Sequence, residues 1–151
     1  MDTEKKTLQM KQRIRAKAVC VVRQKGKVLL IDTHAPERPD IRVLIPVGGG
    51  IDFGEHSKDT AVRETLEEIN AEVVNLRFMG VIENMFSHDE VDYHEHIFAY
   101  EGDFADKSLY DQNEIPGVES SGWEFVCRWI DVELLKSRKV LFFPTQMLEW
   151  L

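Results

Sequence analysis

The chain has 151 residues and an acidic balance, with 27 Asp and Glu against 19 Lys and Arg and a formal net charge of −8. Hydrophobic residues make up 43% and charged residues 30%, which is typical of a globular domain that buries its core without disulfides or structural metals. The acidity argues against non-specific binding to nucleic acid or anionic membranes, because both require clustered Lys and Arg. It still permits a polyanionic substrate if a metal cation mediates the contact.

The sequence predicts a cytoplasmic location. No apolar run approaches the roughly 18 residues that a membrane-spanning helix needs. Residues 1–17 contain six bases and two acids and lack the apolar core of a signal peptide. Cys20 and Cys127 lie in apolar alternating segments, which predicts buried, reduced thiols rather than a disulfide.

The first half of the chain predicts strands and loops that lead into one helix. The expected elements are, in order, a lead-in over 1–12, a hairpin of strands 13–23 and 27–33, a loop over 34–40, a strand over 42–47 and a glycine-rich loop over 48–54. Residues 57–70 form the strongest helix candidate. Ser57 is expected as its N-cap, Asp59 favours the positive end of the helix dipole, and Asn70 tolerates the left-handed conformation that ends helices.

The second half predicts a strand-rich region that ends in helical pieces. The expected elements are strands 72–86 and 93–104 around a tip at 87–92, an acidic loop over 105–121, a strand over 123–130 and helical pieces at 131–136 and 144–151. This order predicts one α/β domain over residues 1–151, in which helices cover a mixed sheet.

The helix over 57–70 has two faces of different chemistry on a helical wheel. One face is expected to pack on the core, and it contains Ala61, Val62, Thr65, Leu66 and Ile69. The opposite face presents three carboxylates at i, i+3 and i+4, which are Glu64, Glu67 and Glu68. Clustered carboxylates on a rigid element are typical of Mg²⁺ sites, where the ion also bridges to substrate phosphates. The alternative is an ordinary solvated acidic face.

Other phosphate and metal motifs do not match. A dinucleotide-binding loop starting at Gly48 would need glycine at its sixth position, where Phe53 stands. The chain has no Gly-Lys-Ser/Thr, which excludes a P-loop, and Asp52 is not followed by the alternating oxygen ligands of an EF-hand. The backbone at Gly48, Gly49 and Gly50 could approach a phosphate closely, because glycine has no side chain.

The segment from Gly49 to Ala71 resembles the signature of the Nudix hydrolases, G-x5-E-x7-R-E-U-x-E-E-x-G-U, where U is a bulky aliphatic residue. The matching positions are Gly49, Glu55, Arg63, Glu64, Glu67 and Glu68. Three positions depart from it, which are Thr65, Asn70 and Ala71, and none of them removes a carboxylate. The order of the flanking strands also resembles the family's α/β/α sandwich with a central mixed β-sheet.

This resemblance implies a pyrophosphohydrolase that uses Mg²⁺ or Mn²⁺. Water would attack the pyrophosphate of a nucleoside diphosphate linked to another moiety, such as a nucleotide or a nucleotide sugar. By resemblance, Glu64 and Glu68 are the principal metal ligands, and Glu67 is a third ligand or a base that acts through water. Arg63 would hold a glutamate carboxylate by charge-assisted hydrogen bonds.

The same resemblance assigns roles to the loop before the helix. Glu55 would support the site, a carbonyl near Gly49 would complete the metal coordination, and Gly48, Gly49 and Gly50 would bind phosphate. Members of the family often use an additional acid outside the signature as ligand or base. The sequence offers three candidates without selecting among them, which are Glu95, Glu114 and Glu119.

Two weaker features stay open. His94 and His96 share one face of a predicted strand and could bind zinc, but the sequence identifies no convincing third ligand, which favours ordinary surface histidines. Trp123 and Trp129 could stack on a base, although aromatic residues in strands more often belong to the core.

Other functions are compatible with the same residues. The chain could be a regulatory module that binds a nucleotide or metabolite without turnover, or it could catalyse a different metal-dependent reaction such as isomerisation. A full set of carboxylates argues against a pure binding role. The expected partner is a small-molecule diphosphate; homodimers are common among relatives of this kind, and the sequence leaves the oligomeric state open.

Overall fold

The computed structural model describes residues 12–88 and 90–151, so most of the lead-in predicted over 1–12 lies outside the described residues. The strands in the described ranges are β1 (Ile14–Gln24), β2 (Lys27–Ala35), β3 (Arg38–Ile45), β4 (Val47–Gly50), β5 (Val73–His88), β6 (Val91–Phe104), β7 (Glu114–Val118), β8 (Glu124–Asp131) and β9 (Leu141–Phe142). The helical elements are α2 (Ser57–Ile69), α3 (Val132–Lys136) and the 3₁₀ turns η1 (Lys107–Asp111) and η2 (Thr145–Trp150).

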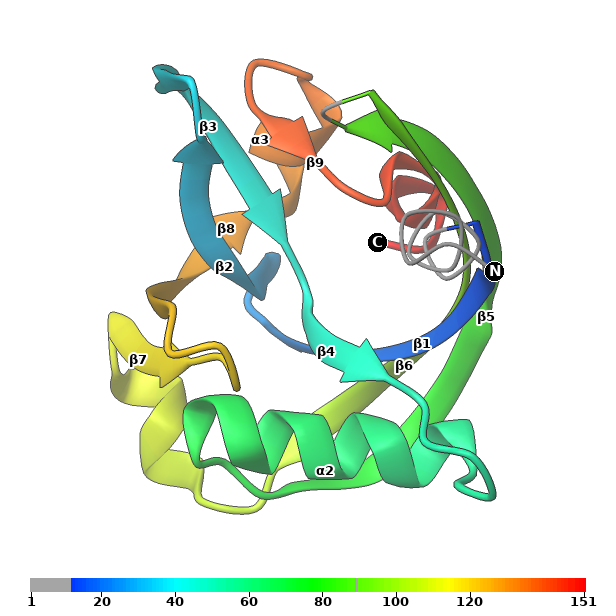
Figure 1. The fold of residues 1–151 in the computed structure, drawn as a ribbon. Coiled ribbons are helices and arrows are strands. Elements are labelled where there is room, and N and C mark those ends of the chain that lie inside the picture. Colours follow the sequence, from blue (N-terminus) through cyan, green and yellow to red (C-terminus); the bar gives the residue numbers. More distant parts are fainter. Residues whose placement is uncertain (1–11, 89) are drawn as a thin grey trace.

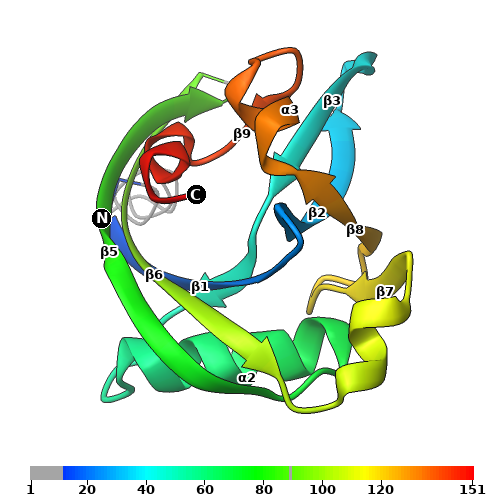
Figure 2. The same cartoon turned by 180° about the vertical axis from the view of Figure 1, so that it is seen from behind.

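The strands form a mixed sheet in the order β5-β6-β1-β2-β3-β9, with β4 added to β1, and with β7 and β8 added beside β2. Strand β1 joins the two halves, because it runs parallel to β6 along most of its length and pairs with β2 only at its end. Figures 1 and 2 show the result: β5 and β6 curve around one side, while β2, β3 and β8 form the other.

Helices cover both faces of this sheet. Alternate residues of β1 point to opposite sides, so Ala18 and Cys20 pack in one buried cluster with α2, while Val19 and Val21 pack in a second cluster with Met147 of η2. Both views show α2 lying across one end of the molecule beneath β4 and β1, with η2 inside the curve of β5 and β6. This arrangement confirms the predicted α/β/α sandwich with a mixed sheet.

One of the two predicted ends of α2 is confirmed. Asn70 has the left-handed conformation (φ 53°, ψ 38°), and its backbone N–H donates to the carbonyl of Leu66. The predicted N-cap at Ser57 is wrong, because the helix begins there and His56 occupies the cap position without a side-chain hydrogen bond. The Ser57 hydroxyl instead lies 2.6 Å from the hydroxyl of Tyr100, which ties the start of α2 to β6.

Three predicted loops contain more structure than expected. Over 34–40, β2 extends to Ala35 and β3 already begins at Arg38, and Arg42 of β3 donates two hydrogen bonds across the hairpin to Asp32. The predicted loop over 105–121 contains η1 and β7, and the predicted tip over 87–92 is mostly taken up by the ends of β5 and β6. Where these segments form strands, pairing with a neighbouring strand outweighs the local preference for a loop.

The two cysteines agree with the prediction of buried, reduced thiols. Cys20 and Cys127 are both free and buried, and burial raises the pKa of each thiol to about 12. No helix in the described part of the chain is long and apolar enough to cross a membrane.

Candidate active site

The buried face of α2 is rotated from the one predicted. Thr60, Ala61, Thr65, Glu68 and Ile69 are the buried residues of the helix. Leu66, expected in the core, is 50% exposed, whereas Glu68, expected on the solvated face, is 8% exposed. The separation of an apolar and an acidic face was therefore wrong at these two positions. We refer to Glu64, Glu67 and Glu68 below as the α2 carboxylates.

The first part of the predicted glycine-rich loop is a strand, and this strand packs against α2. Gly48, Gly49 and Gly50 belong to β4, and they pair antiparallel with β1. Glycine at position 49 has a steric reason: a Cβ there would lie 2.5 Å from the carboxyl carbon of Glu64. The absence of a side chain therefore lets the Glu64 carboxylate lie directly against the β4 backbone.

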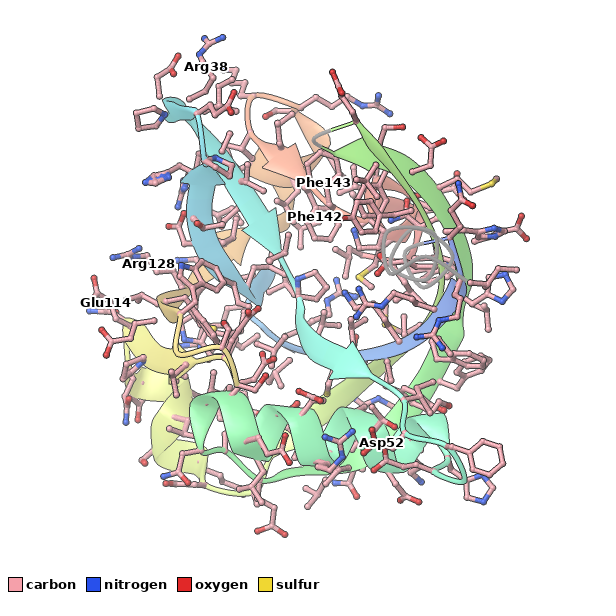
Figure 3. The ribbon with its side chains drawn as sticks, viewed as in Figure 1. Arg38, Asp52, Glu114, Arg128, Phe142 and Phe143 are labelled. Atoms are coloured by element: carbon pink, nitrogen blue, oxygen red, sulfur yellow. The ribbon has the colours of Figure 1, made fainter. Side chains whose placement is uncertain are left out.

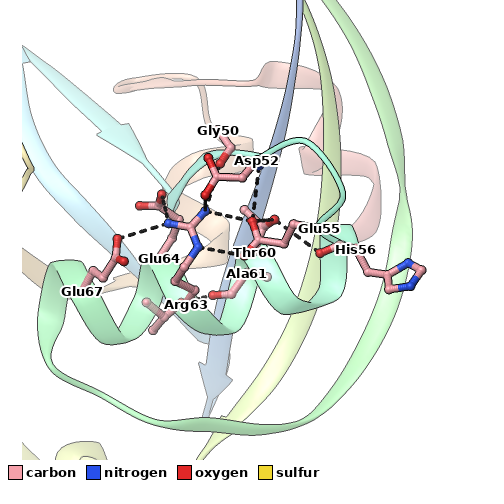
Figure 4. A network of polar contacts seen from close by, with 10 residues as sticks. Gly50, Asp52, Glu55, His56, Thr60, Ala61, Arg63, Glu64 and Glu67 are labelled. Carbon is pink, nitrogen blue, oxygen red and sulfur yellow. Dashed lines mark hydrogen bonds and ion pairs between the residues drawn. The ribbon is translucent and has the colours of Figure 1, made fainter.

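Arg63 is the centre of a polar network at the N-terminal half of α2 (Figure 4). Its Nε and Nη2 atoms donate to the two carboxylate oxygens of Glu55 at 2.8 and 2.9 Å. Its Nη1 donates to Glu64 Oε1 at 3.0 Å and to Glu67 Oε2 at 3.2 Å, and Nη2 also reaches the Gly50 carbonyl oxygen at 3.2 Å. One guanidinium thus connects the preceding loop, β4 and two α2 carboxylates.

Hydrogen-bond donors surround the carboxylate of Glu55. Besides the fork from Arg63, its Oε1 accepts a hydrogen bond of 2.6 Å from the Thr60 hydroxyl and one of 3.3 Å from the Asp52 backbone N–H. The hydrogen bonds from Arg63, and then from Thr60, lower the pKa of Glu55 to about 2. Glu55 is therefore an anion that fixes the orientation of Arg63.

Glu68 has the opposite environment. Its Oε2 is buried and has no hydrogen-bond partner within the described ranges. Burial, and then the negative charges of Glu64 and Glu119, raise the pKa of Glu68 to about 8, although a hydrogen bond from the Gly48 backbone opposes the rise. A buried carboxylate oxygen without a donor is costly unless a cation or proton neutralises it.

These residues fit a hard divalent cation. The donor set consists of carboxylate oxygens and a nearby backbone carbonyl, which are the ligands that Mg²⁺ and Mn²⁺ prefer. The orphaned oxygen of Glu68 is the atom that such an ion would satisfy. Glu67, which is 57% exposed at its side chain, lies at the solvent side of this group.

The three candidate acids outside the helix differ in their position relative to the α2 carboxylates. Glu119 lies in the turn between β7 and β8, and its charge acts on Glu68. Glu114 forms a 2.8 Å ion pair with Arg128, and Figure 3 shows this pair at the opposite end of α2 from Asp52. Glu95 is buried and lies 3.6 Å from the Lys17 ammonium, on the sheet face that points away from α2. Only Glu119 of these three is brought to the α2 carboxylates.

A pocket of about 540 Å³ opens beside the C-terminal half of α2. Its walls come from Glu67 to Asn70 on one side and from β7 and β8 on the other. A second pocket of about 450 Å³ adjoins it and shares Glu124 and Phe125 with it. Trp123, which stands at the edge of the second pocket, is 40% exposed, contrary to the expectation that strand aromatics belong to the core.

The chain resembles several solved structures, two of which are NUDIX hydrolases. The chain is similar to a MutT NUDIX hydrolase from Burkholderia pseudomallei, with a TM-score of 0.58 and 20% identity over 81% of this chain and 86% of that one. It is also similar to a NUDIX hydrolase from Nitrosomonas europaea (TM-score 0.59, 15% identity, 91% and 85% covered). The E. coli ORF135 protein has a TM-score of 0.53 at 16% identity, with 91% and 87% covered.

The family assignment comes from the sequence itself. A family model described as the NUDIX domain matches residues 11–151, nearly the whole chain. Nudix enzymes generally use divalent metal cations and act on small phosphate-containing molecules. The chain therefore belongs to the Nudix family, as a hydrolase that acts on phosphoric anhydrides.

Proposed function

We propose that this enzyme is an Mg²⁺- or Mn²⁺-dependent pyrophosphohydrolase that cleaves a nucleoside diphosphate linked to a second moiety. The observation that supports this proposal most strongly is the buried carboxylate oxygen of Glu68, which lacks a donor beside the further negative charges of Glu64 and Glu119. A buried carboxylate without a partner destabilises the folded protein, whereas a bound cation would attract it and offset that cost.

The residues that would hold the cation follow from this geometry. Glu64 and Glu68 are its principal ligands in our proposal, with Glu119 and a carbonyl of β4 near Gly49 completing the set together with water, while Glu67 takes the alternative role of base. When bound, the cation neutralises the diphosphate and lowers the pKa of a coordinated water. Gly48, Gly49 and Gly50 would form the backbone surface that the phosphates approach.

The remaining polar residues act around the reacting atoms. Glu67 has one oxygen 3.2 Å from Arg63 and is exposed at the pocket, so it can take the proton of the attacking water. The water oxygen then bonds to phosphorus while the anhydride P–O bond breaks, and the leaving phosphate takes up the released charge. Arg63 and Glu55 position Glu64 and Glu67 and do not contact substrate.

Two adjoining pockets support a substrate with two parts. The pocket beside the α2 carboxylates suits the diphosphate, and the second pocket suits a planar or polar group. Trp123 is exposed at the second pocket, and an indole ring there can stack on a nucleobase. We therefore expect Trp123→Ala to raise KM more than it lowers kcat, and Trp129→Phe, outside both pockets, to change neither.

A hydrolysis screen tests this proposal. The substrates are nucleoside triphosphates, ADP-ribose, dinucleoside polyphosphates, nucleotide sugars and capped RNA, each with Mg²⁺ and with EDTA. We expect turnover of at least one nucleoside diphosphate derivative with Mg²⁺ and none with EDTA. Nucleotide binding without turnover would favour the regulatory module instead, and conversion of a substrate without anhydride cleavage would favour another metal-dependent reaction.

A further inference from the structure

A second group of potential metal ligands lies on the outer part of the β5–β6 hairpin. It consists of Glu83 on β5 and His94 and His96 on β6, which we call the histidine cluster. Glu83 lies directly opposite His96 in the antiparallel register, and Met85 lies directly opposite His94. One ligand atom from each member of the cluster lies within 4.8 Å of those of the other two.

The histidine cluster is separate from the α2 carboxylates. Alternate residues of β6 share one face, so His94 and His96 lie on the same side as Tyr100. Tyr100 contacts Ser57 at the very start of α2. His96 is four residues before Tyr100, about 13 Å along the strand at roughly 3.3 Å per residue. The Glu64 carboxylate lies against Gly49 of β4, and β4 and β6 pair with opposite edges of β1, so β1 stands between the two groups.

One polar atom of the histidine cluster lacks a partner among the described residues. Nε2 of His94 is buried and finds no hydrogen-bond partner in residues 12–88 and 90–151. Oε1 of Glu83 lies 3.9 Å from it, which is beyond hydrogen-bond distance. The two imidazole rings meet edge to face, with centroids 5.3 Å apart. Two imidazoles and one carboxylate therefore converge on one point, where Nε2 of His94 is left unsatisfied.

We propose that the histidine cluster binds one late first-row divalent cation, of which Zn²⁺ is the best fit. Two imidazoles with one glutamate form a three-residue zinc set that leaves the fourth position to water. Imidazole nitrogen selects Zn²⁺ and its neighbours over Mg²⁺, so the site is complementary in chemistry to the all-oxygen α2 carboxylates.

The geometry needs only side-chain adjustment to accept the ion. Bonds of about 2.0–2.1 Å in a tetrahedron place ligand atoms roughly 3.4 Å apart, against the 4.8 Å limit that encloses them now. Glu83 is 62% exposed at its side chain, so its carboxylate can rotate toward the two rings. The strand register already fixes the backbones, because Glu83 and His96 are a directly opposed pair.

Occupancy would clamp the hairpin that forms the edge of the sheet. Strand β5 is the outermost strand beside β6, so along its length its pairing is with β6 alone among the described strands. A cation shared by the two strands adds a bond between them that the sheet itself does not supply. Ligand binding to the native state alone raises the melting temperature by mass action.

The test is a Zn²⁺ titration of the untagged full chain by calorimetry, with Mg²⁺ in large excess so that the α2 carboxylates are occupied. A Glu64→Gln/Glu68→Gln protein removes that first site altogether. We expect one Zn²⁺ per chain in both proteins. His94→Gln and His96→Gln should each lower the Zn²⁺ affinity at least about 100-fold, because even outer-shell substitutions lower metal affinity by roughly 10- to 100-fold. The matched control is His34→Gln, which alters a histidine on β2.

Thermal melting gives a second readout that does not depend on catalysis. Zn²⁺ should raise the melting temperature of the wild type and of His34→Gln, and leave that of His94→Gln/His96→Gln unchanged, while circular dichroism confirms that each protein is folded. Equal Zn²⁺ affinity in the wild type and the folded His94→Gln/His96→Gln protein would overturn the proposal, as would the loss of Zn²⁺ binding in the Glu64→Gln/Glu68→Gln protein.

Discussion

Two glutamates on either side of Arg63 differ sharply in environment. Glu55, in the loop before α2, accepts hydrogen bonds from Arg63 and Thr60, and these lower its pKa to about 2. Glu68, one helical turn beyond Glu64, is buried without a donor on Oε2, and its pKa is raised to about 8. A carboxylate that is fully compensated by the protein maintains structure, whereas one left uncompensated is a place for a cation. These two kinds of carboxylate should respond differently to substitution.

The largest loss of activity is expected at Glu68, the carboxylate without a hydrogen-bond donor on Oε2. Glu68→Gln should lower kcat/KM at least about 100-fold, because a direct metal ligand matters more than the outer-shell partners whose loss costs roughly 10- to 100-fold. Steady-state hydrolysis with Mg²⁺ measures this effect. Glu133→Gln is the control, because Glu133 lies on α3, which Figure 1 shows at the other end of the molecule from α2, and it should keep full activity. Equal activity in the two variants would remove Glu68 from the metal site.

The backbone that receives Glu64 is the next point to change. Gly49→Ala places a methyl group 2.5 Å from the Glu64 carboxyl carbon, so the carboxylate must move. We expect activity to fall by roughly 10- to 100-fold, as for other displaced metal-site groups. Gly50→Ala is a matched control for Mn²⁺ binding, since a Cβ there meets no described atom within 4 Å and leaves the Glu64 carboxylate in place. If both variants bind Mn²⁺ equally well, the contact between Gly49 and Glu64 has no role in the metal site.

Substitution of Arg63, which compensates the charge of Glu55, should act through the position of the α2 carboxylates more than through the loss of charge. Arg63→Lys keeps the positive charge but cannot form the two-nitrogen fork on Glu55. We expect a loss of about 10-fold in kcat, in the range of outer-shell substitutions, with a lower melting temperature. Arg77→Lys, which disrupts a similar exposed arginine cluster with Glu101 and Asp103 on β5 and β6, should lower only the melting temperature. Unchanged kcat in Arg63→Lys would show that the fork does not position the α2 carboxylates.

The last effect does not involve catalysis and concerns the stability of the metal-free protein. Because the folded pKa of Glu68 lies near 8, above its ordinary value of 4.5, the native state binds more protons between these pH values. The free energy of unfolding therefore falls as pH rises from about 4.5 to 8, at most about 1.4 kcal/mol per pH unit, and this loss ends above pH 8. Urea unfolding in EDTA should show that the free energy of unfolding of Glu68→Gln rises relative to that of the wild type between pH 6 and pH 8. A difference independent of pH would contradict the assignment.

The sequence predicted the fold and the identity of the α2 carboxylates better than their environments. Local signals are sufficient for the end of α2 at Asn70 and for the spacing of Glu64, Glu67 and Glu68. The burial of Glu68 depends on β7, whose Gly117 would carry a Cβ only 2.9 Å from the Glu68 carbonyl oxygen. That contact joins segments nearly fifty residues apart, which a helical wheel does not represent.

Long-range register also explains the other differences. The glycines of β4 looked like a loop because glycine disfavours strands, yet pairing with β1 holds them extended. The third member of the histidine cluster, Glu83, was not recognised because only the pairing of β5 with β6 brings it opposite His96. Likewise, Glu119 could be chosen over Glu95 and Glu114 only once the turn between β7 and β8 was placed beside α2. A cross-strand register is the information that these assignments required.

Mn²⁺ binding measured by electron paramagnetic resonance tests the central claim most directly. The experiment uses the His94→Gln/His96→Gln protein as background, so that the α2 carboxylates are the site under test, and compares it with the same protein carrying Glu68→Gln. We predict that the background protein binds Mn²⁺, that Mg²⁺ displaces it, and that Glu68→Gln weakens binding at least about 100-fold. Equal Mn²⁺ affinity in the two proteins would contradict the account, because the uncompensated carboxylate would then hold no cation.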